Sequence, residues 1–183
     1  MTLGYLFTKT LALVTLGGNL FVLLLIVAYI FDRPWYMWLR ALIAQHALLL
    51  GTFIASAATL GSLVYSQVMG YPACILCWTQ RIFMYPQMFI LGLALWRRER
   101  IIAPYAFLSS ILGGGVALYQ WGKDMFALYG GITVPCPAVT GLPSCDRIYV
   151  LEFGYITIPM IALNAFVLIA IVMWMKMRSE ELS

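Results

Sequence analysis

Four cysteines are the residues of this chain whose type and spacing offer chemistry. Cys74 and Cys77 form a C-x-x-C motif, and Cys136 and Cys145 form a C-x8-C pair further along the chain. Cysteine pairs persist as disulfides in oxidising compartments, and thiolates exchange with disulfides through mixed-disulfide intermediates. Two pairs in one chain therefore indicate either fixed disulfides or a relay that moves electrons from one pair to the other.

Three uses of these cysteines compete. Two structural disulfides suit the C-x8-C pair well, but a bridge across C-x-x-C closes so short a loop that it removes little chain entropy. A four-cysteine zinc site is the second use, although the spacing is imperfect and the loops lack the polar residues that normally surround zinc. A redox relay, in which both pairs cycle, is the third.

The residues around the C-x-x-C favour the relay. Tyr71-Pro72-Ala73 precedes the motif, so a helix is predicted to begin near Cys74, where unpaired backbone N–H groups stabilise a thiolate. On that helix Cys74, Cys77 and Arg81 share one face. A charged residue just inside an apolar segment is a functional hypothesis, with snorkelling to lipid headgroups as the alternative. We expect Arg81 to hold a Cys77 thiolate and an anionic oxygen of an electron acceptor.

The elements that position these residues must lie in lipid. The 183 residues are 63% hydrophobic and only 10% charged, whereas soluble domains carry about 25% charged residues. This composition excludes a sizeable soluble domain, and a net charge of +4 without a basic stripe excludes nucleic-acid binding. The sequence has no dinucleotide or flavin fingerprint. The expected acceptor is therefore lipid-soluble, such as a quinone.

Five apolar stretches are long enough to cross a membrane as helices. They cover residues 11–31, 41–68, 78–96, 103–121 and 153–175. The first is predicted to be retained, because its apolar run is too long for a signal peptide and no cleavage site follows it. Seven of the eleven Lys and Arg fall on one side, which predicts a cytoplasmic C-terminus and both cysteine pairs on the outer face.

Two further features position the site. A stripe of small residues (Gly51, Ala55, Ala58 and Ser62) predicts close helix packing in the second span, without a chemical role. Residues 122–152 are predicted to form a long outer loop that lies along the membrane surface and moves.

The chain resembles a known family at these motifs. The stretch from Cys74 to Arg81 (Cys-Ile-Leu-Cys-Trp-Thr-Gln-Arg) resembles the quinone-linked thiol oxidase family of DsbB, and the segments 134–136, 144–145 and 153–160 are similar to its BdbC-type branch. The resemblance covers roughly residues 41–175. The C-x-x-C precedes the loop pair here, which is the reverse of the order in the vitamin K epoxide reductase family.

The resemblance implies an all-α membrane protein built on a four-helix transmembrane bundle. Residues 41–176 would form that bundle with its two outward-facing cysteine loops. Residues 1–40 would add one extra N-terminal transmembrane helix and a cytoplasmic loop, which the family core does not explain. Residues 177–183 would form a cytoplasmic tail, in the cytoplasmic membrane of a bacterium.

The resemblance also implies a division of labour among the catalytic cysteines. A reduced thioredoxin-fold protein, like DsbA or BdbD, would attack the Cys136–Cys145 disulfide at Cys136, and Cys145 would then engage Cys74. Cys77 would be released as a thiolate facing ubiquinone or menaquinone, with Arg81 at the quinone site. Tyr119 and Gln120 are candidates, by location only, for a further polar residue near the quinone. The rival interpretation is a non-enzymatic membrane scaffold with two structural disulfides.

Overall fold

The computed structural model describes residues 2–31, 34–99, 101–131 and 143–180. The helices are α1 (Thr2–Ile30), α2 (Pro34–Gln45), α3 (Ala47–Leu63), the π-helical turn η1 (Val64–Val68), α4 (Ile75–Arg97), α5 (Ala103–Gly130) and α6 (Ile158–Glu180). Over these ranges there is no strand, and only one isolated bridge, between Glu152 and Ile156. The predicted all-α fold is confirmed.

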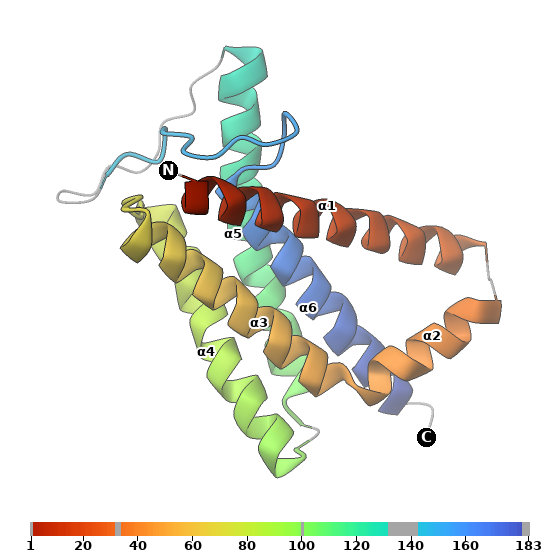
Figure 1. Ribbon diagram of the computed structural model, residues 1–183. Helices are drawn as coiled ribbons and strands as arrows, with labels where there is room; N and C mark the ends of the chain where they lie inside the picture. Colours follow the sequence, from red (N-terminus) through yellow and green to blue (C-terminus); the bar gives the residue numbers. More distant parts are fainter. Residues whose placement is uncertain (1, 32–33, 100, 132–142, 181–183) are drawn as a thin grey trace.

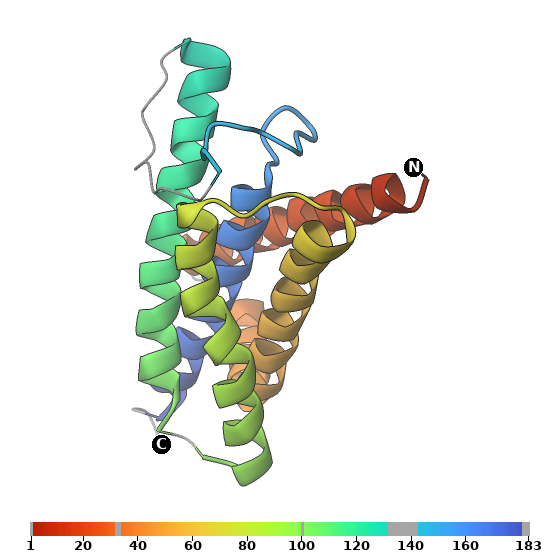
Figure 2. The same ribbon diagram turned by 90° about the vertical axis from the view of Figure 1, so that its left-hand side faces the viewer.

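Helices α3, α4, α5 and α6 pack side by side as a bundle (Figures 1 and 2). Helices α5 and α6 approach closely at Gly113 of α5, where an added Cβ would lie 2.4 Å from the fully buried ring of Phe166 on α6. Only glycine permits this approach of backbone to ring. The apolar part of the bundle core consists of aliphatic, aromatic and methionine side chains, and polar side chains are buried beside it.

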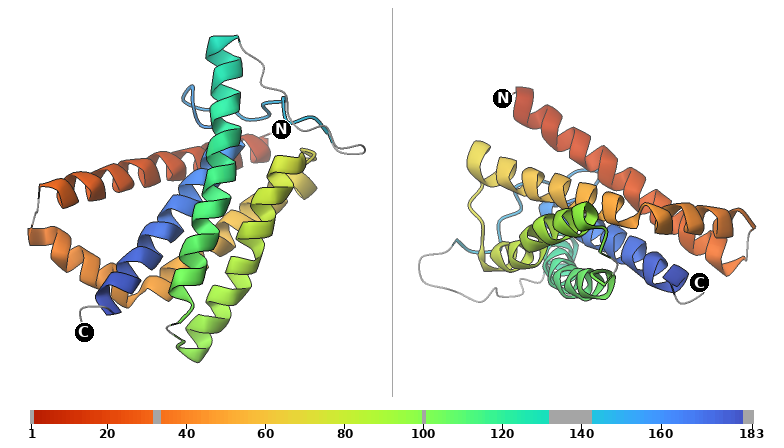
Figure 3. Two further views of the ribbon diagram at one scale, coloured as in Figure 1. Left: turned by 180° about the vertical axis from the view of Figure 1, so that it is seen from behind. Right: turned by 90° about the horizontal axis from the view of Figure 1, so that it is seen from below.

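The extra N-terminal helix is present and crosses the bundle obliquely (Figures 1 and 3). It packs mainly against α6, where Asn164 Nδ2 donates to Asn19 Oδ1 at 2.7 Å. Lys9 forms an ion pair with Glu152 in the segment before α6. Polar contacts therefore attach α1 both to the bundle and to the segment that carries Cys145.

Three helical segments in the described part of the chain are long and apolar enough to cross a membrane: Gly4–Ile30, Ala47–Val68 and Ile158–Ser179. The stretches predicted as the third and fourth spans are also helical, as α4 and α5. These two helices carry buried polar side chains, namely Gln80 and Gln87 on α4 and Ser110, Gln120, Lys123 and Asp124 on α5. Most of the polar groups of the site therefore come from α4 and α5.

Two predicted boundaries were wrong. The stretch 41–68 is not one helix, because the backbone breaks at His46 between α2 and α3. Residues 122–130 continue α5 instead of starting a loop, and the helix ends at Gly131, whose φ of 63° suits glycine. Where this additional part of α5 begins, the helix contacts the segment before α6. There Trp121 Nε1 donates a hydrogen bond to the Tyr155 carbonyl at 2.9 Å.

A candidate thiol–disulfide site beside an apolar cavity

Cys74 and Cys77 lie at the start of α4, as predicted. Cys74 has an extended backbone (φ −76°, ψ 175°) and precedes the first helical residue, Ile75. Both are free thiols, and the Cys74 Sγ donates to the Cys77 Sγ across 3.2 Å. The first turn of α4 thus holds the two sulfurs close enough for a small rotation to join them as a disulfide.

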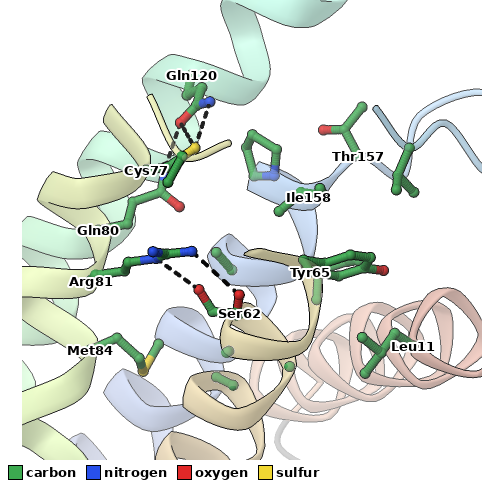
Figure 4. Close-up of a pocket in the computed structure, with 18 of the residues that line it drawn as sticks. Leu11, Ser62, Tyr65, Cys77, Gln80, Arg81, Met84, Gln120, Thr157 and Ile158 are labelled. Carbon is green, nitrogen blue, oxygen red and sulfur yellow. Dashed lines mark hydrogen bonds between the residues drawn. The ribbon is translucent and has the colours of Figure 1, made fainter. Parts of the chain in front are cut away.

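The amide of Gln120 on α5 lies next to the Cys77 sulfur (Figure 4). Its Nε2 is 3.6 Å from the Cys74 Sγ and 3.6 Å from the Cys77 Sγ. Gln80 Nε2 donates to the Gln120 Oε1 at 2.7 Å, which directs the Gln120 NH2 group toward the cysteines. A thiolate formed here would meet an oriented N–H donor in a largely buried setting.

Arg81 extends from α4 to α3 (Figure 4). Its Nε donates to the Ser62 Oγ at 3.1 Å and its Nη2 to the Ser62 carbonyl at 3.3 Å. The guanidinium also lies 5.1 Å from the centre of the Trp78 ring, a cation–π distance. Ser62, assigned to packing alone from the sequence, is therefore the polar group that orients this arginine.

Cys145 is disulfide-bonded and buried. The buried Lys123 of α5 donates to the Cys145 carbonyl at 3.0 Å and to the Asp146 Oδ1 at 2.9 Å. The Ser144 hydroxyl and then Lys123 lower the pKa of Asp146. Lys123 thus fixes the backbone at Cys145. Cys136 lies outside the described residues.

One cavity of about 250 Å³ joins these groups. Cys74, Cys77, Cys145 and Arg81 all line it, as does Gln120. The rest of its lining is mostly apolar and includes Leu11 of α1, Ile54 and Ala58 of α3, Met84 of α4 and Phe166 of α6. The structure therefore brings four of the five predicted site residues to one amphipathic cavity.

Sequence reasoning missed Lys123 and the role of Ser62, and it named Gln120 only by location. Lys123 is the first charged residue after the apolar part of α5 and is followed by Asp124, a weak signal for a buried ion pair. Over the described ranges, no group of three His, Cys, Asp or Glu side chains is placed to bind a metal ion.

Comparison with known proteins shows which family this chain is similar to. A family model described as "Disulfide bond formation protein DsbB" matches residues 44–176. The "Probable disulfide formation protein C" of Bacillus cereus is 34% identical over 136 residues, 74% of this chain and 95% of its own. The "Disulfide bond formation protein C" of Bacillus subtilis is 38% identical over 120 residues, 66% of this chain and 84% of its own.

A "Probable disulfide formation protein" of Coxiella burnetii is 32% identical over 145 residues, 79% of this chain and 97% of its own. No solved structure matches the chain. The family match starts in α2 and therefore leaves α1 outside it.

Proposed function

The chain belongs to the DsbB family of membrane disulfide oxidoreductases, and from this premise we propose that it oxidises a secreted thioredoxin-fold dithiol and passes the electrons to a quinone. The observation that supports this function best is the cavity shared by Cys74, Cys77, Cys145 and Arg81. In this cavity the cysteine sulfurs and the Arg81 guanidinium lie next to apolar side chains. A lipid-soluble electron acceptor needs both a polar, reactive end and an apolar lining of this kind.

The first exchange takes place at the loop pair. A thiolate of the reduced partner attacks the Cys136 sulfur, the Cys136–Cys145 bond breaks, and a mixed disulfide forms. The second thiol of the partner then displaces Cys136. The partner leaves with its own disulfide, and Cys136 and Cys145 have gained two electrons as a dithiol.

The second exchange passes these electrons to the C-x-x-C. The Cys145 thiolate attacks Cys74 of a Cys74–Cys77 disulfide, and Cys77 leaves as a thiolate. Cys136 then attacks Cys145, which restores the loop disulfide and leaves Cys74 reduced. The Lys123 contact with the Cys145 carbonyl supports this route, because it holds Cys145 at the cavity that Cys74 also lines.

The Gln120 amide and the start of α4 both favour negative charge on Cys77. The Gln120 Nε2 lies 3.6 Å from its sulfur, and helix N-termini stabilise thiolates. A hydrogen bond to a charged group contributes about 1.5–3 kcal/mol. Release of Cys77 as the leaving thiolate is therefore the step that Gln120 assists.

The residues present fit a quinone. Arg81 would provide N–H donors for a ring oxygen, and the apolar lining from α1, α3 and α6 suits a hydrocarbon tail. A bound ubiquinone or menaquinone supplies the two-electron, two-proton acceptor for the Cys74–Cys77 dithiol. Arg81, fixed by Ser62, would orient the ring of a bound quinone and stabilise negative charge on its oxygen.

The test is a quinone-dependent thiol oxidation assay with purified protein and a reduced thioredoxin-fold donor. Cys74→Ser and Cys77→Ser are expected to abolish quinone reduction, because either change removes the dithiol that reduces the quinone. Both variants should still exchange disulfides at the loop pair. Normal turnover in either variant would exclude the relay. If the wild type reduces no quinone and its loop pair resists exchange with the reduced donor, the scaffold interpretation holds instead.

We assign the protein to the cytoplasmic membrane of a bacterium, with the cysteine loops outside and the C-terminus in the cytoplasm. The positive-inside distribution of Lys and Arg supports this orientation. The oxidoreductase unit comprises residues 41–176, flanked by residues 1–40 and the tail 177–183. Labelling of a Phe153→Cys variant, at a position 52% exposed in the segment that carries Cys145, by a membrane-impermeant maleimide in intact cells or spheroplasts tests the outward orientation.

A further inference from the structure

Helix α1 lies outside the family match, yet it lines the cavity that holds Arg81. Its lining residues are Leu11, Val14 and Thr15, which are spaced to share one face of a helix. Thr15 is buried, Leu11 is half-buried, and Val14 is 64% exposed. This face of α1 therefore runs from the inside of the cavity to its rim.

The position of α1 is fixed by contacts along its length. Asn19 bonds to Asn164 of α6, Lys9 pairs with Glu152, and the rings of Phe7 and Tyr65 meet at 5.6 Å. A Cβ at Gly61 of α3 would lie 3.6 Å from a methyl group of Leu11. These contacts hold α1 in place as one of the helices that line the cavity.

The rim of the cavity is apolar on both sides. Opposite α1, the lining residues Phe53 and Ala57 of α3 are exposed, with Phe53 at 72%. Both α1 and α3 are among the segments apolar enough to span a membrane. An opening between them therefore faces hydrocarbon and not water.

The opposite end of the cavity is polar. Cys77 and Gln120 lie across the cavity from Leu11 (Figure 4). Arg81 and Gln80 belong to the same lining. A molecule that fills the space thus places a polar head near the cysteines and an apolar chain along α1.

We propose that α1 and α3 form a lateral entrance to the acceptor cavity, and that the apolar tail of the quinone passes between Val14 and Phe53. This inference rests on the proposed function. It also implies that α1 helps to select the quinone according to the quinone's apolar tail. Because α1 lies outside the family match, the entrance belongs to this chain's own N-terminal extension.

Matched tryptophan substitutions on α1 test the entrance. Val14→Trp narrows the rim, whereas Leu13→Trp adds the same ring at a neighbouring position that is 57% exposed and absent from the lining. We expect Val14→Trp to raise the KM for decylubiquinone about tenfold, the effect of losing roughly two buried CH2 groups. The KM for tailless ubiquinone-0 should not change. Leu13→Trp should match the wild type with both quinones.

Photolabelling gives a second readout that needs no turnover and no variant. A quinone with a photoreactive group on its tail is bound to the wild-type protein and irradiated, and the labelled residues are found by mass spectrometry. Labelling of residues 11–15 and 53–57 supports the entrance. Labelling confined to α5 and α6 overturns it.

The outcomes separate the two proposals. If the wild type reduces neither quinone with a reduced thioredoxin-fold donor, the proposed function fails, and the entrance fails with it. If the wild type reduces both quinones but Val14→Trp and Leu13→Trp have equal kinetics, only the entrance is overturned.

Discussion

Gln120 and Ser62 are polar side chains outside the C-x-x-C motif, and each contacts one of the groups on which the site depends. Gln120 lies 3.6 Å from both sulfurs, and Ser62 accepts two hydrogen bonds from Arg81. Both come from helices other than α4. At the scale of single residues, thiol and arginine are therefore oriented by neighbours 19 to 46 positions away in sequence.

Replacement of Gln120 tests its contact with Cys77. Gln120→Leu keeps the approximate size of the side chain and removes the N–H donor, so the Cys77 thiolate loses a hydrogen bond. We expect turnover with quinone to fall at least about tenfold, in line with the loss of a bond to a charged group. The measurement is kcat in the quinone-dependent assay.

Tyr119→Phe is the matched control. The sequence made Tyr119 a candidate for a residue near the quinone, but its side chain is 50% exposed and absent from the cavity lining. Tyr119→Phe is expected to leave turnover unchanged. Equal losses in the two variants would show that Gln120 has no specific effect on the sulfurs.

At this scale the sequence predicts the features that depend on local spacing, and it does not predict those that depend on tertiary contact. The helix start near Cys74 and the shared face of Cys74, Cys77 and Arg81 depend on residues within two helical turns, and the structure confirms the helix start. The partners of these residues depend on how α3 and α5 pack against α4. No spacing rule within one segment identifies Gln120, Ser62 or Lys123, because that packing is set by the whole bundle.

At the scale of elements, the extension of α5 and the segment before α6 form one unit around Cys145. Lys123 holds the Cys145 carbonyl and Asp146, and Trp121 holds the Tyr155 carbonyl. Residues 122–130 were predicted to belong to the outer loop 122–152 that follows the apolar stretch 103–121. These tertiary contacts stabilise the extra length of α5 by more than the helix loses at Gly122, because one glycine destabilises a helix by only about 1 kcal/mol.

The pH dependence of this unit follows from Asp146. Its pKa is lowered in the folded protein by the Ser144 hydroxyl and Lys123. A carboxylate with a lowered pKa stabilises the fold fully above its unfolded pKa of about 4, and that contribution is lost as the pH falls through the folded pKa. The Lys123–Asp146 pair is therefore expected to persist throughout the neutral and mildly acidic range.

The measurement is the stability difference between the wild type and Asp146→Asn, followed from pH 8 downward. The difference is expected to be constant to about pH 5 and to shrink only below about pH 4. A difference that disappears between pH 7 and pH 5 would contradict the lowered pKa. Glu99→Gln, which changes an exposed carboxylate paired only at 3.9 Å with Arg97, provides the control.

At the scale of the whole molecule, polar contacts attach the N-terminal helix α1 to the bundle. The Asn19–Asn164 hydrogen bond joins α1 to α6 at 2.7 Å, and Asn19 Nδ2 also reaches the Tyr155 hydroxyl at 3.4 Å. The sequence predicted an extra helix because the apolar run is long enough to span a membrane. It could not predict where that helix docks, because polar pairing between helices depends on their rotation and depth.

A double-mutant cycle measures this docking. Asn19→Leu and Asn164→Leu are each expected to destabilise the protein, because each leaves the other amide with a lost partner. The double variant should cost less than the sum, with a coupling of about 1 kcal/mol, the usual size for hydrogen bonds between membrane helices. Unfolding in a detergent and denaturant series gives the four free energies. Strict additivity would show that α1 is not held by this pair.

The contact between Arg81 and Ser62 also bears on biogenesis. An arginine in a single inserted helix costs up to about 2.5–3.5 kcal/mol on translocon scales, the value at the helix centre, and Arg81 lies two turns from the start of α4. Both acceptors that Ser62 provides to Arg81 lie on α3, which is synthesised before α4. The α3–α4 hairpin can therefore leave the translocon with its arginine already hydrogen-bonded, before α5 and α6 have been made.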